Sequence, residues 1–442
     1  MDRNLQTSLV NCDRRLTMDT NTTPANEATT LPKGFCLYPW IGSHVSTDGN
    51  IAPCCEFDGE VGSLKDTTLN EVWNGKKLAE VRADFIARKS LKACWKCHDR
   101  EQREGSSMRL EAQAWYPEWY DRLGKDADRL ASAAPEFPVM LDLRFSNLCN
   151  FSCRSCWHGS SSSWFKDGQA IGVTAGGKAE IRSFKAIDDV VQQIGSGLDT
   201  LEELYFAGGE PLMMAEHYSL LKLLVERGQT GVFLRYNTNL SRTEFAGTSI
   251  FDLWSKFDKV MVYASVDAVG AEGALVRNGF NWNTFVENIG QLRRTCPSAV
   301  IRFGVTVSVL NILSLPELLE ALVDECGAAP GDIHLHSLQE PDFYRSQVLP
   351  ARLKRQATAQ IRDYIRTVLL RHETDIARAS EFSRYLLGVV HYMNSSDLTE
   401  KLPQFRDMMK RLDALRSQNS KVTLPKLRSV LDDGDTENGS AG

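Results

Sequence analysis

Three closely spaced cysteines are the residues of this chain best suited to chemistry. Cys149, Cys153 and Cys156 follow directly on an apolar, strand-like segment, Val139–Phe145. Three thiolates are one short of the four ligands that a structural zinc ion takes. They can hold three irons of a cubane 4Fe–4S cluster, which normally takes four cysteines, and leave the fourth iron for a ligand from outside the chain. The alternative is three structural thiols, since free cysteine behaves as a small apolar residue.

Glycines and polar or charged side chains at the ends of two later strand-like segments, with one arginine just beyond the second, could accompany such a cluster. Glycine lets the backbone approach a ligand closely, and a guanidinium group can bind a carboxylate through two hydrogen bonds. In a parallel α/β barrel these groups would meet at the carboxyl ends of the strands. The alternatives are ordinary strand-to-helix turns, a helix N-cap and a solvated arginine. The candidates are Gly208, Gly209, Glu210, Ser265, Asp267 and Arg277.

A second group of cysteines lies upstream. Cys94 and Cys97 have two residues between them, and Cys36 and Cys54 flank a predicted hairpin that contains Gly49. Two such pairs make a four-thiolate site, with Cys55 as a spare thiol. Cysteine spacing alone leaves both zinc and an iron–sulfur cluster open.

Composition sets further bounds. The chain has 442 residues, a net charge of −6 and no long basic run, which argues against a large nonspecific nucleic-acid surface. No segment reaches the roughly 18 apolar residues of a membrane span, and residues 1–30 lack an apolar signal core. Because most of the eleven cysteines are clustered, we expect metal ligation in a cytoplasmic protein rather than disulfides.

Alternating strand and helix patterns predict an α/β fold. Helices are expected at Ser183–Leu198, with Ser183 as N-cap, and at Ala215–Arg227, Thr243–Lys256, Trp282–Arg294 and Leu315–Glu325. Six strands linked by right-handed crossovers are too few for a closed eight-stranded barrel. The strands are expected at Val139–Phe145, Leu201–Phe206, Val232–Asn237, Val260–Val266, Val300–Val309 and Asp332–Ser337.

The predicted organisation has six regions. The strand-and-helix core is preceded by a small cysteine-rich α+β domain and followed by a helical C-terminal region. Residues 157–182 are interpreted as a mobile flap, or alternatively as a structureless insertion. The boundaries are 1–30 for a disordered tail, 31–107 for the cysteine-rich domain, 108–136 for a helical connector, 137–340 for the core, 341–430 for the helical region and 431–442 for a second tail.

The three-cysteine motif resembles the signature of the radical S-adenosylmethionine (radical SAM) superfamily. Gly208-Gly209-Glu210-Pro211 and Ser265-Val266-Asp267 resemble two further motifs of that family. The resemblance implies a partial (β/α)6 TIM-type barrel whose open iron binds SAM. It assigns Glu210 to the methionine amino group, Ser265 and Asp267 to the ribose or methionine portion, and Arg277 to the SAM carboxylate. Two positions depart from the pattern: Leu240 replaces a usual glycine after Thr238-Asn239, and Ser155 replaces an aromatic residue, so Phe151 or Trp157 would stack on adenine.

Residues 31–107 resemble the SPASM/twitch domains of the same superfamily, which carry auxiliary 4Fe–4S clusters. The resemblance favours iron and sulfur over zinc at Cys36, Cys54, Cys94 and Cys97. Such domains usually follow the radical core, whereas this one precedes it. The order is similar to that of twitch-domain proteins of phages, which would place the protein in the host cytoplasm.

The resemblance implies reductive cleavage of SAM to a 5′-deoxyadenosyl radical, which abstracts a hydrogen from a substrate C–H bond. Flavodoxin or ferredoxin would supply the electron, and the enzyme would be an isomerase or an oxidoreductase. Three substrate classes stay open: an aminoacyl-thymidine adduct in phage DNA, isomerised by radical chemistry; a ribosomally made peptide; and an aminocyclitol or sugar. A non-enzymatic iron–sulfur or zinc scaffold is the rival class.

Several polar side chains at strand ends are candidates for substrate contacts. They are Arg144, Arg235, Thr306, Ser308, His334, His336 and Glu340. A DNA substrate would need a basic groove, for which Arg100, Arg103 and Arg109 are the candidates, with a solvated helix face as the alternative.

Overall fold

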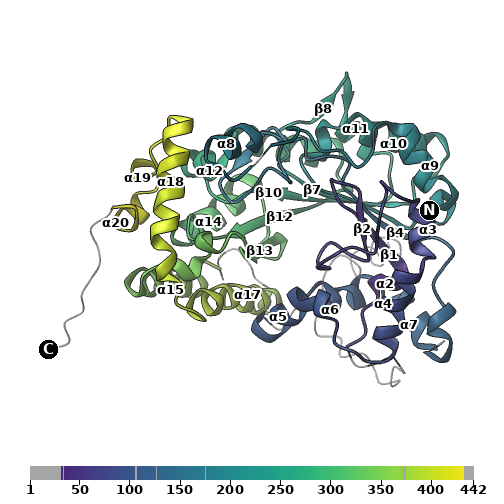
Figure 1. Ribbon diagram of the computed structural model, residues 1–442. Coiled ribbons are helices and arrows are strands. Elements are labelled where there is room, and N and C mark those ends of the chain that lie inside the picture. The colour runs from purple at the N-terminus through teal and green to yellow at the C-terminus, as the bar shows by residue number, and fades with distance from the viewer. Residues whose placement is uncertain are drawn as a thin grey trace, which may run out of the picture. The chain divides into compact units, whose positions relative to one another are not determined.

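The computed structural model describes residues 31–32, 34–104, 107–125, 127–174, 176–369, 371 and 375–432. The predicted tail at 1–30, and all but two residues of the one at 431–442, lie outside this range. The chain forms two compact units (Figure 1). The first contains the residues up to Arg144 together with Ser183–Tyr205 and Gly231–Leu234. The second contains Phe145–Arg182, Phe206–Thr230 and the chain from Arg235 onward.

The first unit combines short helices with five strands in the order β6-β4-β1-β2-β3. The strands are β1 (Gly42–Val45), β2 (Asn50–Ala52), β3 (Gly62–Ser63), β4 (Met140–Leu143) and β6 (Glu203–Phe206), of which Phe206 belongs to the second unit. The helices are α2 (Tyr38–Ile41), α3 (Leu69–Trp73), α4 (Lys76–Ile86), α5 (Trp95–Glu104), α6 (Met108–Trp115), α7 (Pro117–Lys125) and α9 (Ile187–Ile194). Short 3-10 turns cover Lys92–Cys94, Ala127–Ser132 and Gly195–Thr200.

Strand β1 joins the cysteine-rich segment to the first strand of the predicted core. It pairs with β2 in the antiparallel hairpin predicted around Gly49, which has a φ of +87°. On its other side β1 pairs with β4 in parallel, with Gly42 opposite Met140 and Val45 opposite Leu143. The cysteine-rich segment therefore shares backbone hydrogen bonds with β4.

The second unit carries the strand order β13-β12-β10-β7. These strands are β7 (Phe233–Thr238, from Arg235 in this unit), β10 (Val260–Ser265), β12 (Val300–Val307) and β13 (Ile333–Ser337). The β10–β12 and β12–β13 pairs are parallel. Between them run α10 (Ala215–Glu226), α11 (Ile250–Trp254), α12 (Gly270–Val276), α13 (Trp282–Thr295) and α14 (Leu315–Cys326). All six predicted strands are present, and the α/β architecture with a parallel sheet and a helical C-terminal region is confirmed.

Two local predictions are wrong. The first half of the predicted helix Thr243–Lys256 is a hairpin of β8 (Glu244–Phe245) and β9 (Thr248–Ser249), because Ala246 and Gly247 both adopt positive φ. Ser183 does not cap α9, whose N-cap is Ala186. The Ser183 hydroxyl instead donates to the backbone oxygen of Arg144 at 2.8 Å.

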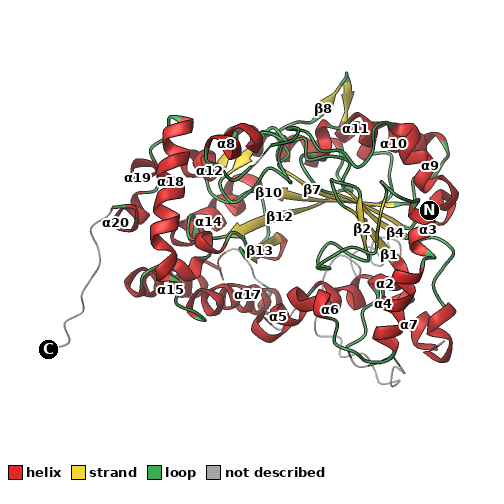
Figure 2. Ribbon diagram, in the orientation of Figure 1, coloured by secondary structure: helices red, strands yellow, loops and turns green. Residues whose placement is uncertain are grey.

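Beyond β13 the chain is helical (Figure 2). The helices are α15 (Ala351–Tyr364), which continues as a π-helix over Ile365–Leu369, α17 (Ile376–Asn394), α18 (Leu402–Arg416), α19 (Ser420–Thr423) and α20 (Arg428–Leu431). Residues 157–182 are not structureless, because they contain α8 (Trp164–Ala170), whose Trp164 packs with Leu412 of α18. Among the helices of the described segments, none has the length and hydropathy that a membrane crossing requires.

Candidate functional site

The three cysteines of the sequence motif lie in a loop that forms hydrogen bonds with neighbouring segments of the second unit. Cys153 ends the short strand β5 (Ser152–Cys153), which pairs antiparallel with β11 (Arg277–Asn278), so that Cys153 lies opposite Arg277. The Cys156 N–H donates to the Cys153 carbonyl at 3.0 Å. Two side chains of the following segment close over the loop: Trp164 Nε1 donates to the Cys153 carbonyl at 2.6 Å, and Ser163 Oγ donates to the Cys149 carbonyl at 2.7 Å.

The two glycines after β6 are required by close packing against the chain that leads into Cys149. A Cβ on Gly209 would lie 2.1 Å from the Leu148 carbonyl oxygen, so no side chain fits there. Gly208 has a φ of +111°, a backbone conformation that favours glycine. The Glu210 N–H donates to the same Leu148 carbonyl at 2.7 Å. This turn therefore fixes the entry to the cysteine loop.

The carboxylate of Glu210 ties two strand ends together. It is buried and accepts hydrogen bonds from Thr238 Oγ1 at 2.6 Å, from the Asn239 N–H at 2.7 Å and from the Leu212 N–H at 3.2 Å. Burial raises the pKa of Glu210 to about 7, although these three hydrogen bonds act to lower it. Much of the acceptor capacity of Glu210 is thus used within the protein, a role for Thr238 and Asn239 that their spacing did not predict.

Leu240 stands where the family motif usually has glycine, and this substitution strains the backbone. Leu240 adopts a φ of +51°, the left-handed region in which glycine is unstrained, and its side chain is fully buried. A left-handed non-glycine residue costs roughly 1–2 kcal/mol, and burying a leucine side chain contributes roughly 2–3 kcal/mol. The apolar contact therefore offsets the backbone strain.

Asp267 and Arg277 form a buried bidentate ion pair. Arg277 Nε and Nη2 lie 2.8 and 3.3 Å from the two carboxylate oxygens of Asp267, which also accepts from the Thr306 N–H at 2.8 Å. The charge of Asp267 raises the pKa of Arg277 although burial acts to lower it. Ser265, the last residue of β10, pairs with Gly304 of β12 at the same strand end.

Electrostatic contacts show that the predicted residues meet in one place. The charge of Arg277 acts on Cys153, Cys156 and Glu210, and the charge of Glu210 acts on Cys149. Burial raises the pKa of all three thiols, that of Cys156 to about 12. Because metals bind the thiolate form, cluster binding at this loop would release protons.

The cysteines of the upstream group converge in the first unit. The Cys36 thiol interacts with Cys94 and Cys97, and the Cys54 thiol interacts with Cys36, Cys55 and Cys97. Burial raises the pKa of all four, that of Cys94 to about 11. Cys55 lies differently: its sulfur is 3.9 Å from Met108 Sδ, and its charge acts on Arg144. Cys36, Cys54, Cys94 and Cys97 thus lie within electrostatic range of one another, and Cys55 acts on Cys54 from the same turn.

Arg109 was predicted as a DNA contact or a solvated side chain, and both predictions are wrong. It is buried, and its guanidinium forms an ion pair with Glu101 through Nη2 and a 3.0 Å hydrogen bond through Nε. Its backbone N–H donates to the Cys97 thiol, and its charge acts on Cys36 and Cys94. The side chain of Arg103 lies outside the described residues.

The candidates for substrate contacts have differing surroundings. Arg144 pairs with Asp142 at 3.3 Å, and the charges of Arg144 and His44 lower the pKa of that buried carboxyl. Ser308 is buried in a turn with Asn311. His334 packs edge-on against Tyr263, and burial lowers its pKa to about 3. His336 and Glu340 are exposed, whereas Arg235 and Thr306 are partly buried.

The two candidates for adenine stacking differ in exposure. Phe151 is buried and packs edge-to-face on Phe280 at 6.5 Å. Trp157 is 67% exposed, directly after Cys156. Trp157 is thus the one of the two whose ring is accessible to a ligand.

Both cysteine groups offer thiols as their metal donors. Among the residues that the structure describes, no three His, Cys, Asp or Glu side chains are arranged to hold one metal ion. A cubane cluster distributes its thiolates over separate irons, so the donor set of both groups, cysteine thiols without histidine, fits a cluster.

Comparison with known families identifies both regions. Residues 143–322 match the radical SAM superfamily, and residues 36–98 match SPASM, an iron–sulfur cluster-binding domain. No match was found among curated proteins. The second match covers the segment that contains Cys36, Cys54, Cys94 and Cys97.

Solved structures show only distant likeness. SuiB of Streptococcus suis bound to S-adenosylmethionine is 15% identical, with a TM-score of 0.33, over 57% of this chain and 50% of that chain. The structure of anSMEcpe with bound AdoMet is 16% identical, with a TM-score of 0.35, over 51% and 61% of the two chains. This chain thus spans about half to three fifths of the length of the proteins it matches, and TM-scores this low carry no argument about substrate.

Proposed function

We propose that this protein cleaves SAM reductively and abstracts a hydrogen atom from a substrate C–H bond. The chain is a radical SAM protein with a SPASM domain ahead of its radical SAM domain. It is therefore an enzyme that uses 4Fe–4S clusters and S-adenosylmethionine. Cys149, Cys153 and Cys156 would hold the SAM-binding cluster. When bound, that cluster supplies the electron that splits SAM into methionine and a 5′-deoxyadenosyl radical. The convergence of the three cysteines with Glu210, Asp267 and Arg277 supports this proposal.

The protein's own groups would orient SAM. Arg277 uses Nε and Nη2 for Asp267, so Nη1 is the guanidinium nitrogen available to the SAM carboxylate. Glu210 would act chiefly by holding the strand ends in place, since its oxygens already accept three hydrogen bonds. Trp157 would supply the aromatic face for adenine.

The second cluster would lie at Cys36, Cys54, Cys94 and Cys97, where it would exchange electrons with the substrate radical or bind the substrate. The placement of Cys55 beside Met108 and Arg144 supports Cys54 as the ligand. Arg144, at the end of β4, would contact the substrate.

The decisive experiment is anaerobic reconstitution with iron and sulfide, followed by an assay for 5′-deoxyadenosine with a strong reductant. The proposal predicts 5′-deoxyadenosine in the wild type and none in Cys153→Ala. Intact SAM with a fully loaded cluster would support the scaffold alternative instead.

The upstream cluster is tested separately. A Cys149/Cys153/Cys156→Ala triple variant should keep about four irons. Zinc without iron in that variant would contradict the second cluster.

A further inference from the structure

Arg416, at the end of α18, has a buried guanidinium group that is ion-paired with Asp167 but whose terminal nitrogens make no hydrogen bond among the described residues. Its side chain is 5% exposed. Nε donates to Asp167 Oδ2 at 2.8 Å, whereas Nη1 and Nη2 have no hydrogen-bond partner among the described residues. Nη2 also lies 2.8 Å from Asp167 Oδ2, but it is not directed at that oxygen. Buried polar atoms without partners are rare in native proteins, so these nitrogens indicate an acceptor that the chain does not supply.

The acceptor would lie on the side of the cysteine loop. The Arg416 guanidinium stacks on the Trp164 ring at 5.2 Å, and Trp164 Nε1 donates to the Cys153 carbonyl. The charge of Arg416 acts on the Cys153 thiol. Cys156 packs against the same cluster of side chains, which includes Leu412 of α18. Arg416 therefore lies against Trp164, within electrostatic range of the Cys153 thiol.

We propose that Arg416 donates hydrogen bonds to the anionic sulfur atoms of the cluster held by Cys149, Cys153 and Cys156, and thereby raises its reduction potential. The inference rests on the cluster assignment of the proposed function. Three thiolates leave an oxidised 4Fe–4S cluster with a net negative charge, and one further electron increases that charge. A buried cation that donates to the sulfurs stabilises the reduced state more than the oxidised state, because net charge and hydrogen bonds to sulfur set the potential of such clusters.

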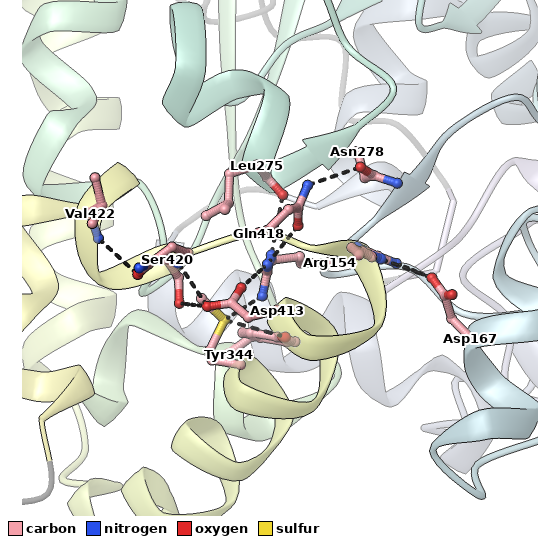
Figure 3. Close-up of polar contacts among 12 residues, drawn as sticks. Arg154, Asp167, Leu275, Asn278, Tyr344, Asp413, Gln418, Ser420 and Val422 are labelled. Carbon is pink, nitrogen blue, oxygen red and sulfur yellow. Dashed lines mark hydrogen bonds and ion pairs between the residues drawn. The ribbon is translucent and has the colours of Figure 1, made fainter.

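A second arginine holds α18 in the position that this role requires. Arg154 lies between Cys153 and Cys156, and its side chain is fully buried. Arg154 Nη2 donates to Asp413 Oδ1 at 2.5 Å and to Gln418 Oε1 at 2.8 Å (Figure 3). Nε donates to the Leu275 carbonyl at 3.3 Å. The cysteine loop and the end of α18 are thus joined through one side chain.

The contacts of Arg154 continue through Gln418 to Asn278 (Figure 3). Gln418 Nε2 donates to Asn278 Oδ1 at 3.0 Å, and Asn278 Nδ2 donates to Ser152 Oγ at 2.8 Å, directly before Cys153. Asp413 Oδ2 accepts from Ser420 N and Oγ at 2.7 and 2.6 Å. Arg154 and Asp413 are accordingly positioning residues, which act on the cluster through Arg416.

The test is a redox titration of the reconstituted full-length protein, followed by electron paramagnetic resonance without SAM. The relevant signal is the one that Cys153→Ala lacks. Arg416→Gln should lower the ratio of reduced to oxidised cluster at least tenfold at a fixed potential, a shift of about 59 mV for a one-electron couple. Arg416→Lys keeps the charge and should recover part of the shift. Asp413→Asn, which weakens the hold on α18, should shift the potential in the same direction.

Arg411→Gln is the matched control, because Arg411 lies on the same helix, pairs with Asp407 and donates to the Ile171 carbonyl through Nη2, so it also joins α18 to the segment that contains Trp164. Its potential should equal that of the wild type. Equal potentials in Arg416→Gln and the wild type, at equal iron content, would overturn the proposal. So would loss of the cluster in both Arg416 variants but not in Arg411→Gln, which would mean that Arg416 acts by packing.

A SAM titration separates the cluster from the SAM carboxylate as the acceptor. If Arg416→Gln weakens SAM binding without changing the potential in the absence of SAM, the guanidinium serves SAM and the inference fails. A potential shift in a protein that never forms 5′-deoxyadenosine would support this inference while refuting the proposed function.

Discussion

Gly209 offers a sharp test of how the turn after β6 supports the cysteine loop. In Gly209→Ala the new methyl group would lie 2.1 Å from the Leu148 carbonyl oxygen, a distance that Cβ atoms essentially never show, so the two segments must separate by about 0.9 Å to reach 3.0 Å. Overpacking of this kind costs roughly 1–3 kcal/mol of folding free energy. A displacement near 1 Å lowers the rate of a positioned reaction by about 100-fold.

The assay is the rate of 5′-deoxyadenosine formation at saturating reductant, measured together with iron content and SAM affinity. We expect the reconstituted variant to bind iron and to lose roughly two orders of magnitude in rate. Gly388→Ala is the control, since a Cβ at Gly388 of α17 meets no atom within 4 Å and α17 carries none of the candidate site residues. Wild-type rate and SAM affinity in Gly209→Ala would refute the argument that this close approach sets the geometry of the loop.

Three further predictions concern other groups. Cys54→Ala should remove the upstream cluster whereas Cys55→Ala should keep it, and iron analysis in the Cys149/Cys153/Cys156→Ala background distinguishes them; equal iron in both would contradict the ligand choice. Arg109→Met should lower the free energy of unfolding by about 3 kcal/mol, because it leaves the Glu101 carboxylate without its counter-charge; an unchanged urea midpoint would count against the ion pair. Burial lowers the pKa of His217 to about 3, below its unfolded value near 6.5. Protonation of the unfolded state should therefore reduce stability as pH falls from about 6.5, by up to roughly 1.4 kcal/mol per pH unit, and His217→Phe should flatten this dependence in urea titrations.

The strands and most helices could be predicted because their signals are local. Each of the six strands is a short apolar run, and the burial pattern of β12 alternates strictly along its length. The hairpin at Ala246-Gly247 was missed because its signal is a single glycine within an otherwise helical pattern. Leu240 takes a conformation that the sequence gives no reason to expect, and only its buried side chain explains why glycine is absent.

The motif residues could be found from the sequence, but their partners could not. The cysteines and the glycines carry distinctive spacing, whereas Arg154 and Asp413 are more than 250 residues apart. Arg109 resembled a surface residue because arginine side chains are usually exposed, and its burial follows from its ion pair with Glu101 in the first unit. Arg416 gave no signal in the sequence, since its importance depends on the nitrogens that tertiary structure leaves without acceptors.

The parallel pairing of β1 with β4 has a consequence for dissecting the protein. A truncated chain beginning after residue 107 would lack the neighbour of β4 and would bare a row of amide and carbonyl groups to other molecules. Unpaired strand edges form hydrogen bonds with strands of other molecules and so promote aggregation. The cysteine-rich segment is thus not a detachable module, and transplanting it to another enzyme would require carrying β4 along as its hydrogen-bonded template.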